Sequence, residues 1–197
     1  MTDAHRKTIK HFDKCSDVHE LTFSCHNRMP LLSNDHWTKM LAQSITNATK
    51  RHCFQLIAFV FMPEHVHLLV HPDGIEASIP NLLKAIKRPF SYRIKQILIK
   101  NQSPLLEKLT VLQRPGVKSF RFWLEGPGYD RNITEKDTLE KVIDYIHKNP
   151  VKRDLCSRAV DWKWSSARYY LDPTAPADLD LPELSRLPAG WSTQRGT

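Results

Sequence analysis

Two apolar segments in the middle of the chain, separated by only two residues, restrict the possible folds more than any other feature. The first, Phe54–Met62, reads FQLIAFVFM, and the second, His65–His71, reads HVHLLVH. Short apolar runs of this kind are typical of strands buried inside a sheet. Pro63 lies between the two segments and has no amide hydrogen to give to a central strand. The sequence therefore predicts a β-hairpin in the middle of a sheet.

The segments around this hairpin alternate between strand and helix periodicity. Alternating side chains predict strands over residues 18–25 and 119–124. Helical spacing of apolar residues predicts a helix from a cap at Ser33 or Asn34 to Arg51, and further helices over 79–98 and 135–149. Residues 101–117 contain two prolines and are expected to form a loop, and Gly126–Gly128 is expected to form a turn.

Prolines and a possible cap refine the last two helices. Pro89 should kink or split the helix over 79–98, and Pro150 should end the final helix. Thr134 and Asp137 approximate a capping box at the start of that final helix.

The resulting order, β–α–β–β–α–β–α, matches the ferredoxin-like split βαβ motif over its first six elements. We therefore expect an α+β fold, with a four-stranded antiparallel sheet that carries its helices on one face. The last helix is an addition to this motif and bears Tyr145.

Composition indicates one domain and a polyanionic partner. A chain of 197 residues can form one sizeable core, which we assign to residues 1–171, and 172–197 reads as a proline-rich extended tail. The net charge of +8 favours DNA, RNA or an anionic membrane. No apolar run approaches the roughly 18 residues of a membrane span, and the N-terminus lacks the apolar region of a secretory signal. The four cysteines include no CxxC pair, which is typical of reduced thiols in a cytoplasmic protein.

The most specific local pattern is His65-Val66-His67 in the second strand of the hairpin. Side chains two residues apart in a strand point to the same face, so both imidazoles can bind one metal ion. His71 has the same parity but lies about 13 Å further along the strand. The alternative is that these histidines are only polar surface.

A second pattern places Tyr145 and Asn149 one helical turn apart in the last predicted helix. The spacing puts a phenol nucleophile and an amide-oxygen ligand on one face. The alternative is ordinary packing beside the apolar stripe. His147 should face elsewhere, at the surface, and Tyr129 should be a turn residue that packs on the sheet. Two imidazoles and an amide oxygen suit Mg²⁺ or Mn²⁺ with room for a phosphate oxygen.

Three blocks of the sequence resemble the HUH single-tyrosine transposases, which carry the insertion sequence 200-like transposase domain. The similarity is greatest to their REP-associated tyrosine transposase branch. The blocks are FMPEHVHLL at residues 61–69, a segment with the YI-x-x-NPV pattern within 122–155, and DWKWSSAR at 161–168. They occur in the family's order, and the resemblance extends over roughly residues 18–171.

The resemblance implies a role for each matching residue. His65 and His67 match the two metal-binding histidines, and Tyr145 matches the nucleophile. Asn149 matches a third, polar ligand, which is glutamine in the best-known single-tyrosine transposases. The implied reaction is cleavage of single-stranded DNA beside a hairpin, which gives a 5′-phosphotyrosine and a free 3′-hydroxyl, and the reversal joins a new strand. The implied cofactor is Mg²⁺ or Mn²⁺.

Basic residues near the predicted elements suit such a substrate, because lysine and arginine contacts to phosphates provide most non-specific affinity for DNA. The candidate DNA-binding residues are Arg28, Lys84, Lys87, Arg88, Arg121, Lys152 and Arg153. The alternative for many of them is a solvated surface. The resemblance further implies a cytoplasmic, nucleoid-associated protein with no membrane partner, either a monomer or a homodimer.

Two other functions compete with strand transfer. A domesticated relative could bind hairpin DNA without cleaving it, although simple binding requires neither a nucleophile nor a metal site. A two-histidine phosphoesterase would require two His-x-Thr/Ser motifs, and the chain has no second copy of its histidine pair.

Overall fold

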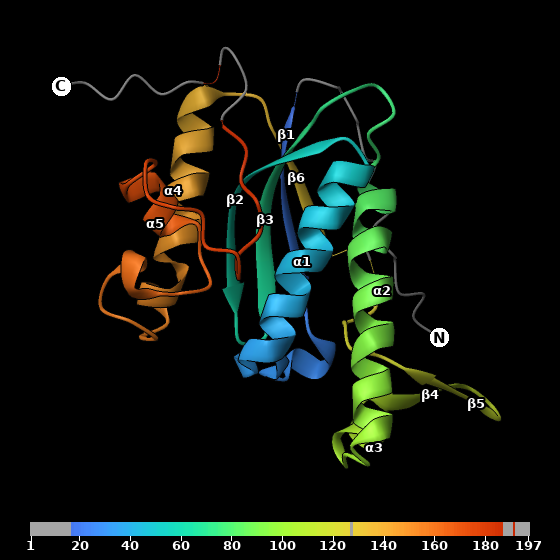
Figure 1. Ribbon diagram of the computed structural model, residues 1–197. Coiled ribbons are helices and arrows are strands. Elements are labelled where there is room, and N and C mark those ends of the chain that lie inside the picture. Colours follow the sequence, from blue (N-terminus) through green and yellow to red (C-terminus); the bar gives the residue numbers. More distant parts are fainter. Residues whose placement is uncertain (1–16, 127, 187–190, 192–197) are drawn as a thin grey trace, which may run out of the picture.

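A computed structural model describes residues 17–126, 128–186 and 191. Its centre is a four-stranded antiparallel sheet in the order β2-β3-β1-β6 (Figure 1). The strands are β1 (Val18–Ser24), β2 (Phe54–Met62), β3 (His65–Pro72) and β6 (Tyr129–Ile133). The predicted hairpin is therefore confirmed, with Pro63 and Glu64 at the turn between β2 and β3. The α+β fold class and the antiparallel sheet are confirmed as well.

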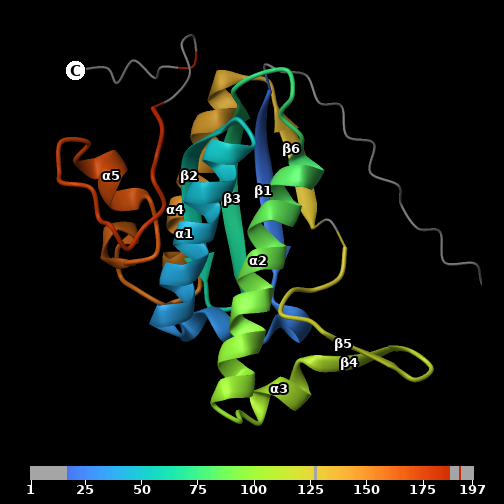
Figure 2. The same ribbon diagram turned by 45° about the vertical axis from the view of Figure 1, so that its right-hand side comes forward.

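Helices cover both faces of this sheet. On one face, α1 (Asp35–Arg51) and α2 (Ile79–Lys100) lie side by side, and α4 (Lys136–Lys152) lies on the other (Figures 1 and 2). Strand β3 shows why, because its alternate side chains enter two separate cores. Val66 and Leu68 pack in the cluster beneath α1 and α2, whereas Leu69 packs with the apolar residues of α4. By the same alternation, His65 and His67 face α4.

The fourth strand differs from the prediction. Residues 119–124 do not form the fourth strand of the main sheet. Instead β5 (Val117–Phe120) pairs with β4 (Thr110–Arg114) in a two-stranded ribbon that projects from the body (Figure 2), and Trp123 makes an isolated bridge to Cys25 just beyond the end of β1. The sheet is completed by β6, which follows the predicted glycine turn. Strand β6 reads YDRNI and lies at the edge of the sheet. Its side chains are mostly polar, so it lacks the apolar alternation that predicts a strand.

The segment before this ribbon also departs from the predicted loop. A single helical turn, α3 (Leu105–Lys108), leads directly into β4. Leu109, between them, is fully buried in the core beneath α1 and α2. One buried residue therefore holds the base of the ribbon against the body.

The split predicted at Pro89 and the helix end predicted at Pro150 do not occur. Helix α2 continues through Pro89, because Ile86, Phe90 and Ile94 remain buried on one face on either side of it. Helix α4 includes Pro150 and continues to Lys152. Proline removes one amide donor, and apolar packing on both sides compensates for that loss.

The helix starts are mixed. Asn34 caps α1, since its side-chain oxygen accepts from the Trp37 amide at 3.1 Å. Helix α4 begins instead after Glu135, whose side chain makes no capping bond, so the predicted capping box does not form.

Residues after α4 cover the free edge of β2. The amide of Phe61 donates to the Trp164 carbonyl at 2.8 Å, and the Ser166 amide donates to the Phe59 carbonyl at 3.0 Å. A short turn of 3-10 helix (Ala159–Asp161) and α5 (Ala167–Leu171) flank this contact. Covering an edge strand in this way removes unpaired backbone groups from solvent.

The described part of the predicted tail, 172–186, contains no helix or strand but packs back on the body. Ser185 donates its amide to the Leu56 carbonyl at 2.8 Å, and Lys39 pairs with Asp180 at 2.8 Å. Apart from Trp191, which packs beside the α4 core, the rest of the predicted tail lies outside the described residues. Within the described residues, none of the helices combines the length and apolar character that a bilayer span requires.

Candidate functional site

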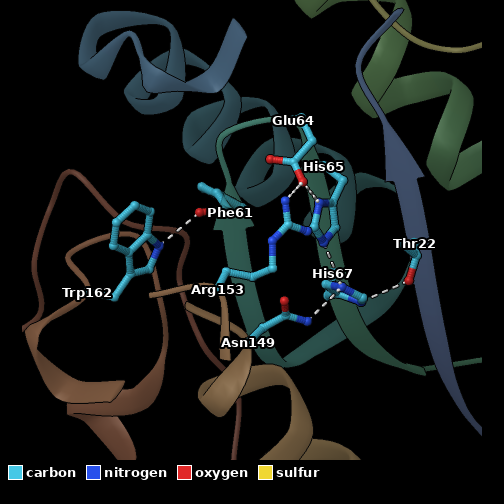
Figure 3. Close-up of polar contacts among 8 residues, drawn as sticks. All are labelled: Thr22, Phe61, Glu64, His65, His67, Asn149, Arg153 and Trp162. Atoms are coloured by element: carbon cyan, nitrogen blue, oxygen red, sulfur yellow. Dashed lines mark hydrogen bonds and ion pairs between the residues drawn. The ribbon is translucent and has the colours of Figure 1, made fainter. Parts of the chain in front are cut away.

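The imidazoles of His65 and His67 meet at the start of β3. Their Nε2 atoms lie 3.0 Å apart, and their ring centroids are 4.8 Å apart. Both residues are buried, with exposed fractions of 7% and 5%. The same-face geometry predicted from the His-Val-His spacing is therefore present, and both rings point one nitrogen to the same spot (Figure 3).

Each imidazole also makes a polar contact through its other ring nitrogen, Nδ1. Nδ1 of His65 lies 3.0 Å from a carboxylate oxygen of Glu64, and that oxygen also pairs with the Arg153 guanidinium at 2.9 Å. Nδ1 of His67 lies 2.9 Å from the Thr22 hydroxyl on the neighbouring strand β1 (Figure 3). When both Nδ1 atoms carry the proton and donate to these oxygens, both Nε2 lone pairs are free.

Thr22 and Glu64 are functional candidates that the sequence did not reveal. Thr22 stands opposite His67 only because β1 and β3 pair in this register, across 45 residues of sequence. Glu64 precedes His65 directly, and this adjacency is the one signal that could have identified it.

Helix α4 brings Tyr145 and Asn149 to the same imidazole. The Asn149 amide nitrogen lies 3.2 Å from Nε2 of His67, and the Tyr145 ring stands edge-on to the His67 ring with centroids 5.7 Å apart. Asn149 is buried, whereas Tyr145 is 43% exposed. Asn149 therefore lies against His67 in the interior. Tyr145, one helical turn earlier, contacts His67 and is also open to solvent.

The electrostatics keep both imidazoles neutral near pH 7. Burial and, to a smaller extent, the neighbouring His65 together lower the pKa of His67 to about 4. Burial also lowers the pKa of His65, against the opposing effect of the Glu64 carboxylate. The pKa of Glu64 is lowered, because His65 and Arg153 outweigh the effect of burial. Neutral imidazoles are the form that binds a metal ion.

The donor set fits a divalent metal. Two ligands about 2.1 Å from an ion and at right angles to each other lie about 3.0 Å apart, which is the separation of the two Nε2 atoms. Among the described residues no three His, Cys, Asp or Glu side chains converge, so a third ligand from this part of the chain would be of another type. Asn149 supplies it if its amide turns over and presents Oδ1. Imidazole with amide oxygen suits Mn²⁺ and, with more water, Mg²⁺.

Six of the seven predicted DNA-binding residues fall into two groups. Arg153 and Lys152 lie at the histidine pair, the former on Glu64 and the latter with its ammonium 4.7 Å from the Tyr145 ring centre. Arg28 belongs to this group, because its charge contributes to the lowered pKa of His65. The second group lines a separate pocket beside α2 and consists of Lys87, Arg88 and Arg121. Lys84 is exposed on the same helix and does not line that pocket.

His147 is not the surface residue that its position in the helix predicted. It is 8% exposed, and its Nε2 lies 2.8 Å from the Ser166 hydroxyl. Its ring also meets that of Tyr170, with centroids 4.9 Å apart. The segment after α4 folds back over this side of the helix, which buries a position that helical periodicity assigns to solvent.

Tyr129 also differs from its predicted place. It begins strand β6, pairs with Thr22 on β1 and is 51% exposed. Trp162 lies near the site and donates its indole N–H to the Phe61 carbonyl at 2.9 Å (Figure 3). Its contact anchors the segment after α4 to β2.

Comparisons with known proteins agree on one family. The family model described as Transposase IS200 like matches residues 16–149. A Haemophilus influenzae (strain Rd) protein, whose name places it among the REP-associated tyrosine transposases, is 27% identical over 117 residues. That match covers 57% of this chain and 58% of the relative's length. A solved structure of a REP-associated tyrosine transposase bound to a REP hairpin superimposes with a TM-score of 0.60 over 96% of both chains. At 20% identity this last likeness concerns the fold.

Proposed function

This chain belongs to the IS200-like transposase family, and from that membership we propose that it is a metal-dependent endonuclease and strand transferase acting on single-stranded DNA at hairpins. Its proposed nucleophile is Tyr145, and its proposed metal ligands are His65, His67 and Asn149. The observation that carries the proposal is the convergence of the two Nε2 atoms beside the Tyr145 ring.

In the proposed reaction the phenol oxygen of Tyr145 attacks a backbone phosphorus. A tyrosine–phosphorus bond forms, the bond to the 3′-oxygen breaks, and that oxygen leaves with a proton as a 3′-hydroxyl. The Lys152 ammonium, 4.7 Å from the centre of the Tyr145 ring, places a positive charge beside the phosphate that the phenol oxygen would attack. Attack by a different 3′-hydroxyl on the phosphotyrosine reverses these steps and joins a new strand.

The residues around the histidines position them for a divalent ion. Glu64 and Thr22 hold the Nδ1 atoms, which fixes both rings with Nε2 directed inward. A bound Mg²⁺ or Mn²⁺ would polarise the phosphate and stabilise negative charge that develops on its oxygens. Arg153, which neutralises Glu64, keeps a half-exposed guanidinium next to the place where a phosphate would lie.

The proposed partner is hairpin DNA, including repetitive palindromic elements. The net charge of +8 and the cationic group around the histidines support a polyanion, and the similar solved protein is described as bound to a REP hairpin. Tyr145 contacts His67 of its own chain, so one chain holds a complete set of candidate catalytic groups in the proposed monomer or homodimer. We place this activity in the cytoplasm at the nucleoid.

The test is a covalent adduct. Purified protein is incubated with a library of single-stranded DNA hairpins, labelled at either the 5′ or the 3′ end, with Mg²⁺ or Mn²⁺, and analysed on a denaturing gel. We expect a protein-linked band that retains the 3′ label, because a 5′-phosphotyrosine keeps the downstream strand. Tyr145→Phe should abolish this band. Tyr129→Phe is the matched control, since Tyr129 is comparably exposed and should leave the band intact.

Other outcomes discriminate between the alternatives. An adduct that persists in Tyr145→Phe would reassign the nucleophile, with Tyr129 the next candidate. Retention of hairpins without any adduct in the wild type would favour a hairpin-binding protein that does not cleave. Adducts that form equally well with chelator present would contradict the metal assignment.

A further inference from the structure

A second cationic site lies on the opposite face of the sheet from the histidines. A pocket of about 310 Å³ opens between α2 and the chain that leads from β5 toward β6. Its lining includes Lys87 and Arg88 from the helix, Phe120 from the end of β5, and Arg121 and Trp123 from the connecting chain. This size is at the lower end of the range for small-ligand sites.

Lys87 is the unusual member of this lining. Its ammonium lies 4.8 Å from the centre of the Phe23 ring, and burial lowers its pKa to about 8. Among the described residues no carboxylate forms an ion pair with it. Burying a cation is costly unless an anion accompanies it, so the structure places an uncompensated positive charge where a ligand can enter.

The other side chains supply a second cationic contact and a flat apolar surface. Arg121 lines the same pocket and pairs with Glu125, a carboxylate that also lines it and that a phosphate would have to displace from the guanidinium. Trp123 is 7% exposed, and its buried indole N–H has no hydrogen-bond partner among the described residues. A buried donor without a partner is rare in proteins and requires an explanation, of which an acceptor from a water molecule or a ligand is one.

We propose that this pocket binds one nucleotide of unpaired DNA, with its phosphate on Lys87 and Arg121 and its base against Phe120 and Trp123. Aromatic rings beside cationic side chains are the general means of holding single-stranded nucleic acid, because every base has a face that can stack. The inference rests on the proposed function, since it names a second place on the protein, apart from the histidines, where the DNA strand is bound.

Backbone contacts connect the pocket to the histidine pair. Trp123 forms a β-bridge with Cys25, and the Cys25 amide donates to the Glu64 carbonyl at 2.8 Å. Glu64 in turn contacts His65. The pocket and the histidines therefore lie at the same end of the sheet on opposite faces, and a strand that leaves one site reaches the other by passing around that end.

The test measures binding without cleavage. The full chain, with EDTA to prevent any metal-dependent reaction, is titrated into a fluorescein-labelled dT12 oligonucleotide at several NaCl concentrations, and anisotropy is recorded. We expect Lys87→Met to weaken binding and to reduce the slope of log K against log [NaCl] by about 0.7, the value for one phosphate of a single strand. Arg93→Met, which removes an exposed charge of the same helix outside the pocket, should bind as the wild type does.

Crosslinking locates the base independently of affinity. A dT12 strand that carries 5-iodouracil should, on irradiation, attach to the peptide that contains Phe120 and Trp123. Equal losses in Lys87→Met and Arg93→Met, no loss in either, no binding of dT12 by the wild type, or crosslinks found only elsewhere would each overturn the proposal. Because EDTA is present throughout, failure of the adduct assay would leave these results unaffected, and the two proposals fail separately.

Discussion

Replacing Thr22 by valine is the most direct test of how the histidine pair is held. Valine keeps the shape of threonine but removes the hydroxyl that lies 2.9 Å from Nδ1 of His67. Because His67 is buried, Nδ1 would lose its partner without gaining water, which should lower the free energy of unfolding by about 1–3 kcal/mol. The ring would also lose the contact that fixes its orientation.

The larger consequence should be in metal binding. Loss of a hydrogen bond behind a metal-ligating histidine typically weakens metal affinity or activity by about 10–100-fold. We therefore expect Thr22→Val to need about 10–100-fold more Mn²⁺ for half-maximal adduct formation, while hairpin binding in EDTA stays unchanged. Mn²⁺-dependent stabilisation against thermal unfolding should shift in parallel, since a ligand that binds only the folded state stabilises it according to its affinity.

Thr49→Val is the matched control. The Thr49 hydroxyl is buried in α1 and donates to the Ile45 carbonyl at 3.1 Å, on the other face of the sheet. Its removal should lower stability without changing the Mn²⁺ requirement. If Thr22→Val and the wild type required the same Mn²⁺ concentration, the orienting role of Thr22 would be refuted.

Three further outcomes test the site and the fold. His65→Ala and His67→Ala should each abolish the adduct and retain hairpin binding in EDTA; adduct formation at wild-type rate by either would remove that residue from the site. Burial lowers the pKa of His147 to about 4, against about 6.5 when unfolded, so the unfolded chain binds more protons between these values. Denaturant titrations should therefore show stability falling as pH drops from 7 to 4, by roughly 3 kcal/mol from this residue, and falling less in His147→Gln. Gly128→Ala would place Cβ 2.3 Å from the Thr22 carbonyl oxygen, whereas Cβ at Gly116, also at positive φ, meets nothing within 4 Å. Gly128→Ala should thus destabilise the protein more than Gly116→Ala, and equal losses would argue against close packing at this turn.

The candidate site was predictable where local geometry alone sets the arrangement. Strand alternation places His65 and His67 on one face whatever the rest of the chain does. Helical spacing likewise places Tyr145 and Asn149 on one face. Each pair is fixed by the backbone geometry of a few residues in one strand or one helix, so a pattern in the sequence is sufficient to find it.

The fourth strand shows where this reasoning stops. Strand β6 is joined to the sheet by backbone hydrogen bonds to β1, which side chains of almost any kind permit. The segment 119–124 has the apolar alternation of a strand. Its residues Phe122 and Trp123 pack in the core beneath α2 instead of forming the fourth strand. Apolar alternation indicates that one face of a segment is buried, but it does not indicate which element covers that face.

The sequence by itself determined the order of the central elements, the position of the hairpin and the two residue pairs that carry the candidate chemistry, because each depends on the local period of the chain. Only the tertiary structure decided that α4 packs on the histidine face, that Thr22 stands behind His67 and that the segment after α4 buries His147. These arrangements depend on strand register and on packing between residues far apart in the chain, and their free energy is gained only when the whole core forms.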